Sequence, residues 1–178
     1  MRIISGKLKG RIFNPPKNFK ARPTTDFAKE NLFNILNNRI DWEETTALDL
    51  FGGTGGISFE LVSRGCKKVV CVEKDHKHAE YIEKNRKELS LSELSVLKMD
   101  VFKYLEYYNQ KFDLIFVDPP YELKDFETIP QLILKKDILI KGGLFIMEHP
   151  KKYDFSHLPT FQDVRAYGSV HFSFFGEE

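Results

Sequence analysis

The four residues Asp118-Pro119-Pro120-Tyr121 form the segment with the most specific chemistry, and they directly follow the apolar run 112–117. Proline cannot extend a strand or donate an amide hydrogen, so the pair stiffens the predicted loop and leaves its carbonyls free to accept. The Asp118 carboxylate and the Pro119 carbonyl can accept both hydrogens of an exocyclic amine on a nucleobase. Accepting them would draw the nitrogen toward tetrahedral geometry and free its lone pair to attack an electrophilic methyl group. Tyr121 offers a face on which the base can stack, worth about 1–3 kcal/mol.

A glycine-rich turn, 51–56, follows the apolar run 47–51 and precedes a predicted helix. Glycines permit positive φ and let a ligand approach the backbone closely, while the N-terminus of a helix presents free amide donors. As a dinucleotide fingerprint the turn would be Gly53-x-Gly55-x-x-Ser58, with serine where Gly or Ala is needed, which disfavours a nicotinamide cofactor. Ligands of parallel sheets bind at the carboxyl ends of the strands, so the turn predicts a small-molecule site.

Acidic residues stand at or near the ends of three successive predicted strands, namely Asp49, Glu73 and Asp100. Glu73 follows Gly55 by 18 residues, where a carboxylate can accept hydrogen bonds from both hydroxyls of a ribose. Asp100 is placed to accept from an adenine amino group, and the amides of Val101 and Phe102 could serve the ring nitrogens. Together these residues predict a pocket for an adenosine.

The elements that must position these residues alternate between strand and helix, which is typical of a parallel sheet with crossover helices. An amphipathic helix begins after Thr24 or Thr25, either of which is a good N-cap, and runs to about residue 40. The predicted strands are 47–51, 68–73, 95–99, 112–117 and 143–148, and the predicted helices are 56–64, 76–89, 101–109 and 125–136. The stretch 163–175 alternates and breaks at Tyr167-Gly168, which predicts two adjacent strands, one of them antiparallel in the sheet. The fold class is therefore α/β.

Length and composition place the chain among globular proteins of one domain. It has 178 residues, of which 42% are hydrophobic and 30% charged. Its first residues hold too short an apolar run for a signal peptide, and no run of 18 apolar residues could span a bilayer, so we expect a cytoplasmic protein. The two cysteines do not form a Cys-x-x-Cys pair, and the five histidines show no ligand spacing, so we expect neither a disulfide framework nor a metal site.

The net charge of +1 conceals an asymmetry. Residues 1–25 contain seven Lys or Arg and no acid, which leaves 20 bases against 26 acids in the rest of the chain. Two short alternating segments around 6–9 predict a basic β-hairpin within residues 2–13. Such an arm could neutralise several phosphates and bind RNA in a salt-sensitive way. We therefore divide the chain into a basic hairpin and arm, 1–25, and a catalytic domain, 26–178.

The chain resembles the bacterial small-subunit (16S) rRNA guanine-N2-methyltransferases, enzymes of the group with an Asn/Asp-Pro-Pro-aromatic motif. The N-terminal basic segment and the string Arg22-Pro23-Thr24-Thr25-Asp26 are the most specific parts of the resemblance. The other matching segments are Glu30-x-Leu32-Phe33-Asn34, 48–51 with Gly53-Thr54-Gly55, Val72-Glu73, Asn85, 112–121 and Tyr167-Gly168. The chain departs from these relatives at Gly56-Ile57-Ser58, where a small residue, Leu and Gly are common.

The resemblance implies a Rossmann-like S-adenosylmethionine-dependent methyltransferase fold with a seven-stranded, mostly parallel sheet and an antiparallel last strand. It implies that Asp49, Gly53 and Gly55 hold the methionine part of S-adenosylmethionine, Glu73 its ribose and Asp100 its adenine. The full set of cofactor residues that we expect is Thr25, Asp49, Phe51, Gly53, Gly55, Glu73, Lys74, Asp100, Val101, Phe102 and Asp118. The catalytic residues expected are Asp118, Pro119, Pro120 and Tyr121, and those expected to contact RNA are Arg2, Lys7, Lys9, Arg11, Arg22 and Tyr121.

The expected partner is 16S rRNA, within an assembling small-subunit particle, with no membrane and no obligate protein partner. Two other functions remain open on the sequence. An adenine-N6-methyltransferase of DNA would use the same Asp-Pro-Pro-Tyr chemistry, although 178 residues leave little room for a domain that reads duplex sequence. A non-catalytic RNA-binding assembly factor could keep the fold, but the intact motif argues against loss of catalysis.

Overall fold

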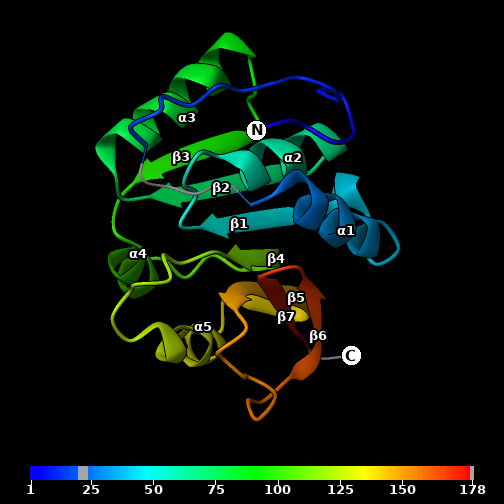
Figure 1. The fold of residues 1–178 in the computed structure, drawn as a ribbon, viewed down its shortest axis with the longest axis vertical. Helices are drawn as coiled ribbons and strands as arrows, with labels where there is room; N and C mark the ends of the chain where they lie inside the picture. Colours follow the sequence, from blue (N-terminus) through cyan, green and yellow to red (C-terminus); the bar gives the residue numbers. More distant parts are fainter. Residues whose placement is uncertain (20–23, 177–178) are drawn as a thin grey trace.

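The sheet has seven strands, and its order can be followed in Figure 1 from β3, in green, to the orange and red β6 and β7. The computed structural model describes residues 1–19 and 24–176. The strand order is β3-β2-β1-β4-β5-β7-β6, in which β7 alone of the described strands runs antiparallel to both of its neighbours. The strands are β1 Thr46–Leu50, β2 Lys68–Glu73, β3 Leu94–Lys98, β4 Phe112–Val117, β5 Leu139–Pro150, β6 Phe161–Tyr167 and β7 Val170–Phe175. The predicted α/β class and its antiparallel last strand are confirmed.

Helices cover both faces of the sheet, as expected when crossovers connect parallel strands. One apolar core lies beneath α1, α2 and α3, and the other lies beneath α4 and α5. The helices are α1 Asp26–Asn37, α2 Gly56–Arg64, α3 His76–Glu88, α4 Val101–Tyr107 and α5 Ile129–Lys136, with short 3-10 turns η1 Trp42–Glu44 and η2 Phe126–Thr128. No helix among the described residues has the length and apolarity needed to cross a membrane.

Most helix boundaries follow from the caps that the sequence contains. Thr25 is the N-cap of α1, since its side chain accepts a hydrogen bond from the amide of Ala28. Asp75 caps α3 and Asp100 caps α4 in the same way. The predicted helix 125–136 is divided, because Asp125 has a left-handed backbone and Pro130 stands in the first turn of α5.

Strand β5 is longer than the predicted 143–148, because it already begins at Leu139 and continues to Pro150. Gly142 and Gly143 interrupt the apolar pattern and conceal its first residues. Gly142 has a φ of 77°, and the pairing of β5 with β4 shifts register between Phe112 and Leu114. An irregularity of this kind adds residues to a strand without extending its alternating pattern.

The basic hairpin forms, although as one isolated bridge between Arg2 and Ile12 rather than as two regular strands. Backbone hydrogen bonds join the amide of Ile3 to the carbonyl of Arg11 and the amide of Phe13 to the carbonyl of Met1. Ile3 and Phe13 are buried, and the ring of Phe13 stacks on that of Phe59 in α2 at 4.6 Å between centroids. The hairpin therefore packs on α2 through its apolar residues while most of its cations face outward.

A buried carboxylate fastens the hairpin to α2. Glu60 is fully buried and accepts hydrogen bonds from the amides of Ile4 and Ser5, at 2.8 and 3.1 Å. Its Oε1 also forms an ion pair with the Nε of Arg64 at 2.9 Å, and its Oε2 lies 3.9 Å from the Nζ of Lys29. Burial lowers the pKa of Lys29, whose ammonium donates to the carbonyl of Arg2. Two cations and two amides thus depend on one carboxylate.

Replacing Glu60 by alanine should lower the free energy of unfolding by about 3–5 kcal/mol, because the variant leaves buried cations and amides without their acceptor. Urea denaturation measures this change. The matched control is Glu44→Ala, which removes an exposed carboxylate paired with Lys67 at 3.5 Å and should cost less than about 1 kcal/mol. Equal losses in the two variants would show that the Glu60 cluster does not hold the hairpin.

Candidate active site

The carboxyl ends of β2, β1, β4 and β5 lie next to one another at one edge of the sheet, because these four strands are parallel neighbours. Five acidic residues lie in or directly after the strands at this edge. Four of them belong to these strands or follow them, namely Asp49, Glu73, Asp118 and Glu148, and the fifth, Asp100, follows the neighbouring strand β3. We call these five residues the strand-end acids. Asp49, Glu73 and Glu148 are each less than a tenth exposed. The structure thus brings together the acidic residues that the sequence predicted, and it adds Glu148.

The glycine-rich turn after β1 has an unusual backbone. Phe51, Gly53 and Gly55 have φ values of 64°, 55° and 80°, so three of its residues are in the left-handed region. A Cβ at Gly55 would stand 2.9 Å from the ring of Phe59. A non-glycine residue at positive φ costs of order 1–3 kcal/mol, so the conformation of Phe51 must be held by its surroundings.

Glu73 helps to stabilise the backbone conformation of the glycine-rich turn. Its Oε2 accepts from the amide of Gly53 at 2.6 Å, and its Oε1 accepts from the amide of Asp75 at 2.6 Å. The carboxylate therefore joins the glycine-rich turn to the start of α3. A carboxylate has about four lone-pair sites, so two remain for the hydroxyls of a ribose. The ribose contact of Glu73 stays a prediction, and the role of Glu73 in shaping the turn was not predicted.

Asp49 lies within β1, is buried, and accepts from the hydroxyl of Ser58 at 2.6 Å. Burial raises the pKa of Asp49 to about 7, and the nearby charge of Glu73 adds to the rise while the Ser58 hydrogen bond opposes it. The serine that departs from the relatives' glycine is thus the hydrogen-bond donor to this carboxylate. This bond joins β1 to α2 on either side of the glycine-rich turn, and the contact of Asp49 with the methionine part of a cofactor stays a prediction.

Asp100 is the N-cap of α4, and this corrects one expectation. Its Oδ1 accepts from the amides of Phe102 and Lys103, and its Oδ2 lies 3.1 Å from the Nζ of Lys74. The Phe102 amide is therefore engaged by Asp100 and is not free for an adenine ring nitrogen, because an N-cap side chain competes for the amides of the first turn. The Asp100 carboxylate remains a quarter exposed at the edge, beside the buried Val101.

Asp118 begins the loop that follows β4, and its amide donates to the carbonyl of Leu50 at 3.3 Å. This bond ties the Asp-Pro-Pro-Tyr loop to the end of β1, next to the glycine-rich turn. Burial and the neighbouring charges of Glu148 and Asp49 raise the pKa of Asp118 well above its usual value. Pro119 is buried and Pro120 is exposed, so the loop is held from one side.

Glu148 near the end of β5 is the main site residue that the sequence analysis missed. It is 4% exposed, and it accepts from the hydroxyl of Thr24 at 2.8 Å and from that of Tyr121 at 3.4 Å. Tyr121 also meets the ring of Phe126 edge-on. Glu148 is the last residue of the predicted strand 143–148, so the rule that selected Glu73 would have selected it too.

Of the predicted RNA contacts, Arg2 and Lys7 each have an acidic neighbour. The Nε of Arg2 lies 3.6 Å from Asp26, and the ammonium of Lys7 pairs with Glu93, which precedes β3. All of these side chains are partly exposed, so solvent screens both pairs and a phosphate can compete for either cation. The Lys7 amide donates to the carbonyl of Ser63 at 2.7 Å, which places the hairpin tip by the C-terminus of α2.

Lys9 and Arg11 are exposed at the same hairpin tip, and Arg22 lies outside the described residues. The tip stands one helix away from the glycine-rich turn, because α2 begins at that turn and ends near the tip. Nine helical residues span about 14 Å. The ring of Phe19, farther along the arm, lies 4.4 Å from that of His78 in α3, so the arm returns toward the strand-end acids.

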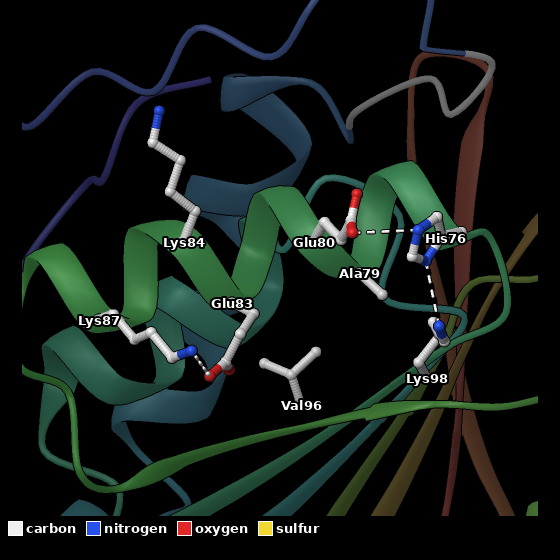
Figure 2. A pocket seen from close by; sticks show the side chains of 8 residues that line it. All are labelled: His76, Ala79, Glu80, Glu83, Lys84, Lys87, Val96 and Lys98. Carbon is white, nitrogen blue, oxygen red and sulfur yellow. Dashed lines mark hydrogen bonds and ion pairs between the residues drawn. The ribbon is translucent and has the colours of Figure 1, made fainter.

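A groove of about 650 Å³ lies away from this site, between α3 and the edge strand β3. Figure 2 shows that most of its charged side chains pair with one another, while Lys84 points away from them and pairs with Glu88 at 3.7 Å. The two ring nitrogens of His76 lie 3.0 Å from Glu80 and 3.1 Å from Lys98, and Lys87 lies 3.5 Å from Glu83. Because these charges already have partners, the groove does not select one class of ligand.

A sequence model of the family described as conserved hypothetical protein 95 matches residues 1–176. The ribosomal RNA small subunit methyltransferase D of Haemophilus influenzae is 34% identical over 155 residues, which are 85% of this chain and 79% of that protein. The protein of the same name from Escherichia coli K12 is 31% identical over 171 residues, 96% of this chain and 82% of its own. The solved structure of a hypothetical protein from Thermus thermophilus is 27% identical, with a TM-score of 0.87 over 99% of both chains.

The raised pKa of Asp49 predicts a specific pH dependence of stability. In the unfolded chain the pKa returns to about 3.8, so between about pH 4 and 7 the folded state holds a proton that the unfolded state has lost. The contribution of Asp49 to stability therefore falls as the pH rises through this window, by at most about 1.4 kcal/mol per pH unit. Asp49→Asn keeps an acceptor for Ser58 and removes the titration.

Urea denaturation of both proteins at pH 5, 6, 7 and 8 checks this prediction. The free energy of unfolding of the natural protein, minus that of Asp49→Asn, should decrease from pH 5 to 7 and then level off. Taking the difference cancels the titration of His149, whose pKa is lowered by burial and whose effect has the opposite sign. A difference that stays constant over the series would contradict the prediction.

Proposed function

The chain belongs to the family described as conserved hypothetical protein 95, and we propose that it transfers a methyl group from S-adenosylmethionine to the N2 amine of a guanine in 16S rRNA. The observation that carries the proposal is the position of the Asp118–Tyr121 loop, tied by the Asp118 amide to the end of β1 beside the glycine-rich turn. Methyl transfer to a base needs groups that accept the hydrogen bonds of the amine and a turn that holds the cofactor, both at the same end of the sheet. Two relatives named as small-subunit rRNA methyltransferases support the same activity.

The strand-end acids and the glycine-rich turn fit S-adenosylmethionine by their chemistry. Gly55 has a φ of 80°, and a Cβ there would stand 2.9 Å from the buried ring of Phe59, so this turn needs glycine for its backbone conformation and for its packing on α2. Glu73 offers carboxylate lone pairs for ribose hydroxyls, and Asp100 offers them for an adenine amine. Asp49, Phe51, Gly53 and Gly55 would lie along the methionine part, with Lys74, Val101 and Thr25 at the rim. When bound, the cofactor supplies an electrophilic methyl group on a sulfonium.

The catalytic work of this chain is to orient the amine and to raise the reactivity of its lone pair. The Asp118 carboxylate and the Pro119 carbonyl accept one N2 hydrogen each, and the ring of Tyr121 stacks on the guanine. The lone pair then forms the new nitrogen–carbon bond as the sulfur–carbon bond breaks, and one N2 proton passes to Asp118 or to water. The raised pKa of Asp118 makes its carboxylate a better proton acceptor. The positive sulfonium of a bound cofactor would favour the ionised form of Asp118, which catalysis requires.

The basic hairpin would bind the RNA phosphates away from the reacting base. Lys9 and Arg11 are exposed, and Arg2 and Lys7 have partly exposed partners, so all four can meet phosphates. Because the hairpin tip and the glycine-rich turn are one helix length apart, the RNA would have to extend along α2 to reach both. Arg22, for which the sequence analysis predicted RNA contact, belongs to the same arm.

The substrate that we propose is 16S rRNA within an assembling small-subunit particle, in the cytoplasm. The arm 1–25 offers a short basic surface, so in this proposal the shape of a folded RNA or of a particle selects the target nucleotide. RNA of this kind is recognised largely through unpaired bases and local shape.

Mass spectrometric mapping of 16S rRNA from cells with and without the protein tests the proposed function. We expect one guanosine to carry an N2 methyl group only when the protein is present, and Asp118→Ala should not restore it. In vitro, Asp118→Ala should lower kcat by about 100-fold or more and bind S-adenosylhomocysteine almost as tightly as the natural protein. Identical methylation maps, or full turnover by Asp118→Ala, would contradict the proposal.

Neutralising Lys9 and Arg11 together, each to Gln, should weaken RNA binding and reduce the dependence of the logarithm of affinity on the logarithm of salt concentration by about 1.4–1.8. Filter binding at several salt concentrations measures both quantities. The control replaces Lys135 and Lys141, which are exposed on other parts of the surface, and should leave the slope nearly unchanged. A double variant with the natural slope would show that the hairpin tip does not contact phosphates.

A further inference from the structure

Phe27 lies in the first turn of α1 and is 64% exposed, although it is one of the larger apolar residues of the chain. The outer face of such a helix is usually polar. The packing of α1 on the sheet does not depend on Phe27, because the apolar residues that the helix buries are Ala28, Leu32, Phe33 and Leu36. The role of this ring therefore has to be sought in what surrounds it.

The ring of Phe27 meets that of Tyr167, at the end of β6, edge-on. Their centroids are 6.1 Å apart, and the two rings are inclined by 82°. Tyr167 is itself only partly exposed, and its ring lies 6.0 Å from that of the buried Phe172. The core thus holds Tyr167 in place, and Tyr167 supports Phe27 in a favourable edge-to-face contact. We call Phe27 and Tyr167 the aromatic pair.

The strand register places Tyr167 at the same edge of the sheet as the strand-end acids. Tyr167 is opposite Val170 of β7, and Val170 is opposite Pro150, the last residue of β5. Neighbouring strands are about 4.8 Å apart, so the backbone of Tyr167 lies about 10 Å from the end of β5. The start of α1 adjoins the same edge, because the hydroxyl of Thr24 donates to Glu148 at 2.8 Å. The aromatic pair therefore borders the candidate active site.

Exposed cations lie on both sides of the aromatic pair. On the side of the hairpin, the Nε of Arg2 lies 3.6 Å from Asp26 of α1. On the side of β6, the Nε of Arg165 lies 2.6 Å from Asp163, and Arg165 precedes Tyr167 by two residues. The side chains of both ion pairs are about half exposed, so solvent screens them and a phosphate can compete for either arginine.

Aromatic rings with cations beside them match single-stranded RNA. Proteins that bind such RNA stack unpaired bases on aromatic side chains and meet the phosphates with Lys or Arg. Docking of a protein would need a larger surface, since a specific protein interface buries about 800 Å² on each partner. Two rings bordered by ion pairs offer far less apolar surface than that, and they suit one planar base.

We propose that the aromatic pair is a second stacking site, which holds an unpaired base that flanks the target guanine on Phe27, with Tyr167 supporting the ring. The inference rests on the proposed function and deepens it, because it names a contact that the RNA makes outside the Asp118–Tyr121 loop. It requires the substrate to be single-stranded over more than the target nucleotide, and it places the start of α1 in the RNA-binding surface.

Binding of a fluorescein-labelled oligoadenylate of 12 nucleotides, followed by anisotropy at several salt concentrations, tests the proposal. This RNA is single-stranded and contains no guanine. Phe27→Ala should bind it about 10-fold more weakly, as expected for the loss of one stacked base. The slope of the logarithm of affinity against that of salt concentration should stay unchanged, because stacking releases no counterions from phosphates.

The matched control is Tyr107→Ala. Tyr107 is 69% exposed, close to the value for Phe27, and it ends α4 over the opposite core of the sheet. This variant should bind the oligoadenylate as tightly as the natural protein. Equal losses in the two variants would overturn the proposal. Natural affinity in Phe27→Ala would overturn it too, and would point to a protein partner for the aromatic pair.

Two further variants of Phe27 separate stacking from apolar bulk. Phe27→Trp keeps an aromatic face and should bind the oligoadenylate within about 2-fold of the natural protein. Phe27→Leu keeps an apolar side chain without that face and should lose about as much affinity as Phe27→Ala. Because Phe27 is mostly exposed, every variant should unfold at the same urea concentration as the natural protein. Natural affinity in Phe27→Leu would contradict stacking.

Methylation of small-subunit particles from cells that lack the protein separates this proposal from the proposed function. Phe27→Ala should raise KM for the particles by about 10-fold, because the base contact that it removes is distant from the reacting atoms. An unchanged KM, with methylation of guanine by the natural protein, would overturn the stacking site and leave the proposed function intact. Absence of methylation by the natural protein would overturn the proposed function, while oligoadenylate binding would still report on the aromatic pair.

Discussion

The arrangement of this protein depends on one electrostatic constraint, the gathering of carboxylates at the carboxyl edge of a parallel sheet. The fold brings the strand ends together, so acidic residues that lie far apart in sequence become neighbours in a largely buried environment. Each carboxylate then needs donors. Backbone amides of the glycine-rich turn and of α3 serve Glu73, a serine hydroxyl serves Asp49, and two hydroxyls serve Glu148. Glu73 keeps acceptor positions beyond these two amide bonds, and we propose that they meet the ribose hydroxyls of S-adenosylmethionine.

Buried carboxylates that need hydrogen-bond donors also connect the N-terminal arm to the candidate active site. On α2, which starts at the glycine-rich turn, the buried Glu60 binds the hairpin through the amides of Ile4 and Ser5. Before α1, Thr24 reaches Glu148 at the other end of the site. The Glu60 and Thr24 contacts thus join the arm both to α2, which starts at the glycine-rich turn, and to β5, and in the function proposed here RNA would lie along this arm.

Much of the fold was predictable, because each strand is an apolar run bounded by a polar cap or a glycine. Asp75 and Asp100 indicated the starts of α3 and α4, whereas Gly142 and Gly143 hid the first part of β5 since an irregular strand breaks the alternation. For the site, the acidic residues could be located from the sequence, but their hydrogen-bond partners within the protein could not. The spacing of Glu73 cannot show that it receives the amide of Gly53, and Asp100 as a cap takes the Phe102 amide that the sequence analysis assigned to adenine. Those partners are set by the loop backbone, which residue types do not specify.

The central claim is that the edge formed by the strand-end acids, and not the groove between α3 and β3, receives the cofactor. Chemical-shift mapping of the backbone amides during titration with S-adenosylhomocysteine tests it most directly, since one experiment observes both places. We expect large changes at Gly53, Gly55 and Asp100 and little change at Glu83, Lys87 and Val96. Changes confined to the groove residues, with the glycine-rich turn unmoved, would contradict it.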